Sequence, residues 1–105
     1  MEFKTQEEVL AFFEGGGVML DTFERTVYIS DVNADGEFFG IMVAMDIPDD
    51  ECGSAVDAAI YAQECIPAPG AFGAPNRMDF MEPDSGWFGQ FAKDVLAYPH
   101  EYVTE

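Results

Sequence analysis

Residues 25–45 read RTVYISDVNADGEFFGIMVAM, and this stretch decides the fold. Its first arm is rich in β-branched and aromatic residues, which favour strands. The tetrapeptide NADG at 33–36 is a turn signal, because Asp and Gly tolerate positive φ angles. The second arm, Phe38 to Met45, is almost entirely apolar, which is typical of a central strand covered on both faces. We therefore predict a hairpin over about residues 26–45, with helices on at least one face.

Three helices are predicted around this hairpin. The run TQEE at 5–8 has the form of a capping box, and it predicts a helix over 6–14 that the glycines at 15–17 end. Pro48 and the three acids after it favour a helix start, which predicts a second helix over 49–65. Ser85 and the apolar stripe that follows it predict a third helix over 86–98, ended by Pro99.

The remaining segments complete an α+β domain. Residues 18–23 and 25–30 have strand composition and form either two strands or one long bent strand. Residues 77–82 alternate as a strand would, inside a loop too long to be wholly irregular. The tail from residue 100 to 105 is expected to be loosely held. We predict a single domain over 1–105, with a small antiparallel sheet of about three or four strands packed with about three helices.

The net charge excludes several classes of function. Twenty-one Asp and Glu residues face only four basic residues, Lys4, Arg25, Arg77 and Lys93, giving a net charge of -17. Internal salt bridges cannot neutralise this excess, so most carboxylates must face water or a partner. Such a field repels phosphates and attracts basic protein surfaces, and direct nucleic-acid binding would need a basic patch. The expected partner is therefore a basic protein.

The lack of targeting patterns and the cysteine usage both predict a reducing, cytoplasmic compartment. No apolar run reaches the length of a membrane span, and the first residues lack the pattern of a signal peptide, so we expect a cytoplasmic protein. Cys52 and Cys65 fall within the predicted second helix, roughly 20 Å apart, and could not pair there. Free thiols fit a reducing compartment, and one His leaves no Cys/His zinc set.

The acidic residues have a pattern as well as a number. Asp50, Asp57 and Glu64 recur every seven residues, which places them on one face of the predicted helix, roughly 10 Å apart. Such a row could imitate part of a phosphate backbone, although a solvated helix face would have the same composition. The predicted partner-binding set adds Asp46, Asp49 and Glu51 near the helix start, Asp31, Asp35 and Glu37 at the hairpin tip, and Phe72 as an aromatic anchor between glycines.

Metal and catalytic motifs are incomplete. Residues 31–36 match the first six positions of an EF-hand loop, which makes Asp31, Asn33 and Asp35 weak candidate calcium ligands. The twelfth position is Met42 rather than a bidentate Glu, so a plain hairpin turn is the simpler interpretation. The chain has no nucleophile elbow, phosphate-binding glycine loop or Ser/His/Asp set. We predict no catalytic residues, no cofactor and no enzymatic activity.

In size, charge and lack of catalytic motifs, the chain resembles the small acidic inhibitors of phages and mobile elements, including DNA-mimic anti-restriction and anti-CRISPR proteins. This resemblance implies a stoichiometric inhibitor that occupies the basic nucleic-acid groove of a host protein, in the host cytoplasm. Two alternatives stay open: an acidic immunity protein or antitoxin against a basic toxin, and a halophilic or calcium-binding small domain. A monomer and a homodimer are both compatible with the sequence.

Overall fold

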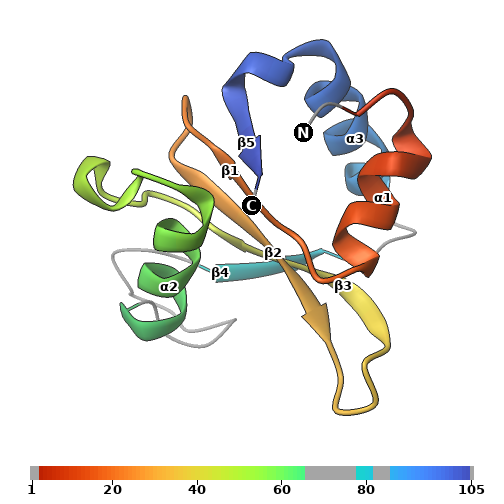
Figure 1. Cartoon of the computed structure of the whole chain (residues 1–105), viewed down its shortest axis with the longest axis horizontal. Helices are drawn as coiled ribbons and strands as arrows, with labels where there is room; N and C mark the ends of the chain where they lie inside the picture. Colours follow the sequence, from red (N-terminus) through yellow and green to blue (C-terminus); the bar gives the residue numbers. More distant parts are fainter. Residues whose placement is uncertain (1–2, 66–77, 82–85, 105) are drawn as a thin grey trace.

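A computed structural model describes residues 3–65, 78–81 and 86–104. Five strands form one antiparallel sheet in the order β4-β3-β2-β1-β5. Helix α2 covers one face of this sheet, and α1 and α3 cover the other (Figure 1). The predicted α+β class is confirmed, with five strands in the sheet. The elements are α1 (Gln6–Glu14), β1 (Val18–Asp21), β2 (Thr26–Val32), β3 (Phe38–Ala44), the 3₁₀ turn η1 (Asp49–Glu51), α2 (Ala55–Cys65), β4 (Met78–Met81), α3 (Gly86–Ala97), η2 (Pro99–Glu101) and β5 (Tyr102–Thr104).

The predicted hairpin is the centre of the sheet. Strands β2 and β3 pair antiparallel, with Val27 opposite Ala44 and Ile29 opposite Met42. Asn33 closes the turn between them, because its Oδ1 accepts hydrogen bonds from the amides of Asp35 (3.0 Å) and Glu37 (2.9 Å). Gly36 follows with φ 81°, a left-handed conformation that glycine adopts without steric cost.

The face of the sheet under α2 is packed with small side chains. Leu20, Val27, Ile29 and Ala44 point toward this helix from β1, β2 and β3. The helix meets them with an alanine stripe at the i, i+3, i+4 and i+7 spacing that puts residues on one helical face: Ala55, Ala58, Ala59 and Ala62, each at most 6% exposed. The opposite face of α2 is therefore left to solvent.

The other face of the sheet carries an aromatic core. Alternation along the strands turns Met19, Tyr28, Ile41 and Val43 toward α1 and α3. The helices contribute Val9, Phe13, Phe88, Phe91, Ala92 and Val95. The rings of Tyr28 and Phe91 lie 4.5 Å apart between centroids. Both faces of β3 are covered, as its uninterrupted apolar sequence predicts.

Helix α1 has the predicted bounds. Thr5 is its N-cap and accepts a hydrogen bond from the amide of Glu8 at 3.2 Å, while the Glu8 carboxylate accepts from the amide of Lys4 at 2.7 Å. After the helix, the chain passes close under the ring of Phe12 at Gly17, where an added Cβ would lie 2.4 Å from that ring. The glycine run thus ends the helix and lets the chain enter β1 at close range.

The second helix begins later than predicted. Residues 49–51 form the separate turn η1, and α2 starts at Ala55. Ser54 caps it, because its Oγ accepts from the amide of Asp57 at 3.1 Å and its carbonyl accepts from the amide of Ala58. The placement of Cys52 and Cys65 on one helix is wrong for the same reason, since Cys52 lies before the cap.

The last residues of the described chain are also more ordered than predicted. Residues 102–104 form β5, which pairs with β1 at one edge of the sheet, so the expectation of a loose tail is wrong there. Residues 78–81 form β4 at the opposite edge, which confirms the strand expected inside the long loop. Residues 18–23 and 25–30 contribute two separate strands, β1 and β2. Within the described ranges, every helix falls short of the length and apolarity needed to cross a membrane.

Candidate functional site

The segment between β3 and the end of α2 presents carboxylates to solvent. We call this surface the acidic face and define it by Asp46, Asp49, Asp50 and Glu51 from the β3–α2 connection and by Asp57 and Glu64 from α2. All are exposed except Glu51, which is half-buried. The alanine stripe fixes the orientation of α2 on the sheet, so the acids at 57 and 64 are held on the outer side. Asp57 and Glu64 are thus displayed by a helix packed on the sheet, and the other four acids by the connection before it.

Among the described residues, ion pairs neutralise little of this charge. Arg25 Nε lies 3.8 Å from Asp49 Oδ1, and this is the one contact within 4.0 Å between a Lys or Arg and a carboxylate among the residues described. The Asp49 side chain is 93% exposed, so water screens the pair and its contribution to stability is small. The face keeps a strong negative potential that a basic partner would meet.

The predicted row of three acids is broken at its first member. Asp50 lies in η1, before the Ser54 cap, and is not on the helix that carries Asp57 and Glu64. These two remain seven residues apart on the exposed side of α2, roughly 10 Å along the axis. Asp50 is exposed in η1 instead, in the connection that precedes α2.

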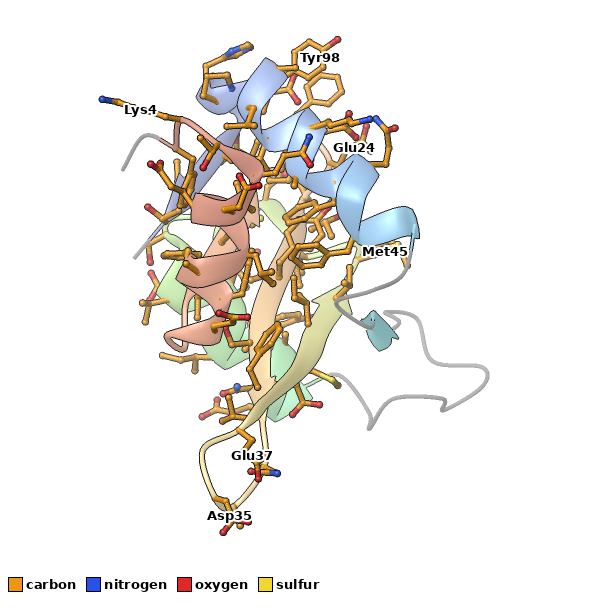
Figure 2. All side chains as sticks on the ribbon, turned by 90° about the vertical axis from the view of Figure 1, so that its right-hand side faces the viewer. Lys4, Glu24, Asp35, Glu37, Met45 and Tyr98 are labelled. Atoms are coloured by element: carbon orange, nitrogen blue, oxygen red, sulfur yellow. The ribbon has the colours of Figure 1, made fainter. Side chains whose placement is uncertain are left out.

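The hairpin tip forms a separate acidic cluster. Asp35 and Glu37 are exposed and lie at the far end of the molecule in Figure 2, while Asp31 is half-buried in β2. Strand β3 separates this tip from Asp46, and its length corresponds to roughly 20 Å. The tip does not extend the acidic face along β3. The three predicted calcium ligands, Asp31, Asn33 and Asp35, lie in the hairpin at or next to this tip. The Oδ1 of Asn33 already accepts hydrogen bonds from two backbone amides.

The structure offers no set of metal ligands within the ranges that it describes, because no three His, Cys, Asp or Glu side chains gather there closely enough to hold an ion. The predicted anchor Phe72 and the side chain of Trp87 fall outside the described residues. Phe88 is 4% exposed and belongs to the core between α3 and the sheet.

Phe23 is a candidate contact residue that the sequence pattern does not single out. Its side chain is 74% exposed in the turn between β1 and β2. The buried carboxylate of Asp21 organises this turn, since its Oδ1 accepts from the amides of Phe23 (2.9 Å) and Glu24 (3.1 Å). The amide and hydroxyl of Thr22 both donate to the carbonyl of Glu101, at 2.9 and 3.1 Å. No local sequence signal marks the exposure of Phe23, because residues 18–23 have strand composition throughout.

Several carboxylates lie near Tyr28 and Tyr102. Burial raises the pKa of Tyr102 to about 12, and the negative charges of Asp21, Asp94, Glu101 and Glu24 add to the effect. Burial also raises the pKa of Tyr28 above its usual range, again with help from nearby acids. Both phenols therefore stay neutral at physiological pH, which removes them as bases.

Cys52 lies beside the acidic face. Burial and the charge of Asp49 raise the pKa of its thiol, so the group is protonated at neutral pH. A protonated thiol is a poor nucleophile and a poor metal ligand. Its Sγ lies 3.7 Å from the carbonyl oxygen of Ile47, which is a weak hydrogen bond within the β3–α2 connection.

An open groove of about 200 Å³ lies between α1 and α3. Its walls are Gln6, Glu7, Leu10, Phe88, Gly89 and Ala92. Glu7 is the one titratable residue in this lining, whereas general acid–base chemistry by paired carboxylates needs two. The groove therefore supplies no recognisable catalytic set.

Comparison of this chain with protein-family models, curated proteins and solved structures finds no match. Similarity to a known protein therefore supplies no function.

Proposed function

We propose that this protein is a stoichiometric inhibitor that binds the basic nucleic-acid-binding surface of another protein by imitating phosphate charge. The acidic face is the observation that carries this proposal. Five of its six carboxylates are exposed, and among the described residues they share a single weak ion pair with Arg25. Asp57 and Glu64 stand on α2, which is packed on the sheet, and the other four lie in the connection that leads to it. The whole chain has a net charge of -17, so the carboxylates outside the acidic face add a long-range field of the same sign.

Electrostatics explains how such a protein would find its target. A field of one sign raises the rate of encounter with an oppositely charged surface by roughly tenfold to a thousandfold, and salt weakens it. Lys and Arg side chains that normally neutralise phosphates would meet carboxylates on the acidic face instead. Binding and nucleic-acid occupancy would then exclude each other. We place this activity in the cytoplasm, where nucleic-acid-handling proteins of a phage host would be found.

Neutralising the acidic face tests this assignment. We expect the triple variant Asp50→Asn, Asp57→Asn, Glu64→Gln to bind a DNA-binding protein about tenfold more weakly, because three exposed charges leave the interface. Suitable targets are a guide-loaded CRISPR nuclease and a restriction endonuclease, with the dissociation constant measured by calorimetry at low and moderate NaCl concentrations.

A matched control separates the acidic face from overall charge. The variant Glu7→Gln, Glu14→Gln, Asp35→Asn removes the same number of exposed charges from α1 and the hairpin tip. It should bind nearly as well as the unmodified chain. Equal weakening by both variants would show that net charge alone drives binding. Binding that DNA does not displace would favour the antitoxin alternative over phosphate mimicry.

A further inference from the structure

Phe23 exposes a larger fraction of its surface than any other large hydrophobic side chain in the described chain. It is 74% exposed, whereas Val32, Val56, Ile60, Tyr98 and Val103 lie between 39% and 51%. A phenylalanine left in water forgoes the favourable free energy of burial that the core gives to Phe13 and Phe91. Packing against the described residues covers only a small part of the Phe23 side chain, which leaves the ring available to a partner.

The backbone that carries Phe23 is held in place before any partner arrives. Asp21 is 4% exposed and binds the amides of Phe23 and Glu24 through one carboxylate oxygen. The amide and hydroxyl of Thr22 donate to the carbonyl of Glu101, the last residue of η2, directly before β5. A contact residue on a fixed turn loses little backbone freedom on binding, so more of its contact energy appears as affinity.

The turn also adjoins the acidic face. Arg25, the last residue of the turn, accepts a hydrogen bond from the amide of Ile47 at 3.0 Å and donates from Nη1 to the carbonyl of Ile47 at 3.2 Å. Its guanidinium contacts Asp49 of the acidic face. Figure 2 shows Glu24, the neighbour of Phe23 in the chain, at the same end of the molecule as the half-exposed Tyr98. The turn that exposes Phe23 therefore includes Glu24 and contacts Asp49 through Arg25.

We infer that Phe23 is the apolar anchor of the partner-binding surface and that the partner is a basic protein with an apolar pocket bordered by Lys or Arg. This inference rests on the proposed function, because it assigns the central contact of the same interface. Binding hot spots have this arrangement, in which one large side chain enters a pocket and polar groups around it exclude water. The acids in and beside the turn select against acidic partners and against nucleic acid itself.

Two designed peptides test the anchor without a known target. Both carry the same arginines on one helical face; the first has leucines on the other face and the second has serines there. Binding of each labelled peptide is followed by fluorescence anisotropy. We expect the unmodified chain to bind the leucine peptide about tenfold more tightly than the serine peptide, and Phe23→Ala to abolish that difference.

Two further variants serve as controls. Ile60→Ala removes another exposed apolar side chain, on α2, and should keep the preference for the leucine peptide. Phe23→Trp retains a large aromatic ring and should keep it too. Thermal unfolding of each variant verifies that the fold is intact, which we expect because residue 23 is exposed.

The outcomes separate this inference from the proposed function. Equal binding of both peptides by the unmodified chain, or a preference that survives in Phe23→Ala, would overturn the anchor and leave the electrostatic proposal standing. If neither peptide bound the unmodified chain at low salt, the proposed function would fail together with the anchor.

Discussion

The buried carboxylate of Asp21 organises the exposed turn between β1 and β2. It is 4% exposed, yet it has no basic partner within 4.0 Å among the described residues, and two backbone amides satisfy one of its oxygens. Hydrogen bonds to a carboxylate are stronger than those between neutral groups. The side chain thereby fixes the turn that carries Phe23 and keeps β1 and β2 in register.

Removal of this carboxylate should destabilise the protein. In Asp21→Ala the amides of Phe23 and Glu24 lose their acceptor, and we expect the free energy of unfolding to fall by about 1–3 kcal/mol. Urea denaturation followed by circular dichroism measures the change. Asp35→Ala is the control, since it removes an exposed carboxylate of the hairpin tip; it should be neutral or slightly stabilising. Equal losses in the two variants would contradict the role given to Asp21.

Tyr102 makes stability depend on pH in the alkaline range. Its pKa in the folded protein is raised to about 12 from an ordinary value of 10.0. The unfolded chain therefore releases this proton first as pH rises, so the stabilisation is fully present below pH 10 and is lost as pH approaches 12. Urea midpoints at pH 9, 10 and 11 should fall in that order, and less steeply in Tyr102→Phe. An identical pH dependence in Tyr102→Phe would refute this assignment.

Among the secondary-structure elements, short sequence motifs correctly predicted those that are fixed by hydrogen bonds between neighbouring residues. The capping box gave α1 its bounds, and NADG located the β2–β3 turn, because each element is fixed by hydrogen bonds among neighbouring residues. The start of α2 was misplaced because the acids at 49–51 also suit a helix start, and here they form η1 instead. Strand β5 was missed because its position depends on pairing with β1, some eighty residues earlier in the chain, beyond the reach of any local pattern.

The candidate site was predictable to a similar degree. Acids crowded between residues 46 and 64 indicate an acidic surface wherever the chain exposes them, and the structure does expose them. Phe23 was not predictable, because the run from Val18 to Phe23 has the composition of a strand throughout. Its exposure follows from the turn that begins at Asp21, which only the tertiary structure reveals.

The observed start of α2 at Ala55 predicts whether Ser54→Ala lowers or raises stability. Ser54 is an N-cap, so Ser54→Ala should cost about 1 kcal/mol of stability. In a helix that began at residue 49, the same substitution would fall in the interior, where alanine has the higher helix propensity and would stabilise. Chemical denaturation of Ser54→Ala therefore decides between the two starts, and a gain in stability would contradict the one described.

For the whole molecule, the dominant fact is a charge of -17 on 105 residues. Like charges on a compact body repel one another, and two copies of the chain repel as well, which opposes self-association through the acidic face. The two apolar cores must hold the fold against this repulsion. A basic partner would remove part of it, so complex formation should stabilise the chain.

Salt should therefore stabilise the free protein. We expect Tm to rise by several degrees as NaCl is increased from about 10 mM to 500 mM, because screening shortens the range of repulsion to a few ångströms. The protein should remain folded at the lowest salt concentration. Complete unfolding there would favour the halophilic alternative instead. Calcium at matched ionic strength should add nothing further, and a gain in Tm that a chelator reverses would favour the calcium-binding alternative.

The central claim is that the acidic face occupies a surface that otherwise holds nucleic acid. Its most direct test is a displacement titration, in which this chain is added to a labelled DNA duplex bound to a guide-loaded CRISPR nuclease or a restriction endonuclease. We predict that anisotropy of the DNA falls to the free value near one equivalent of chain, and that the Asp50→Asn, Asp57→Asn, Glu64→Gln variant requires about tenfold more. Retention of the DNA on every such protein at saturating chain would contradict phosphate mimicry.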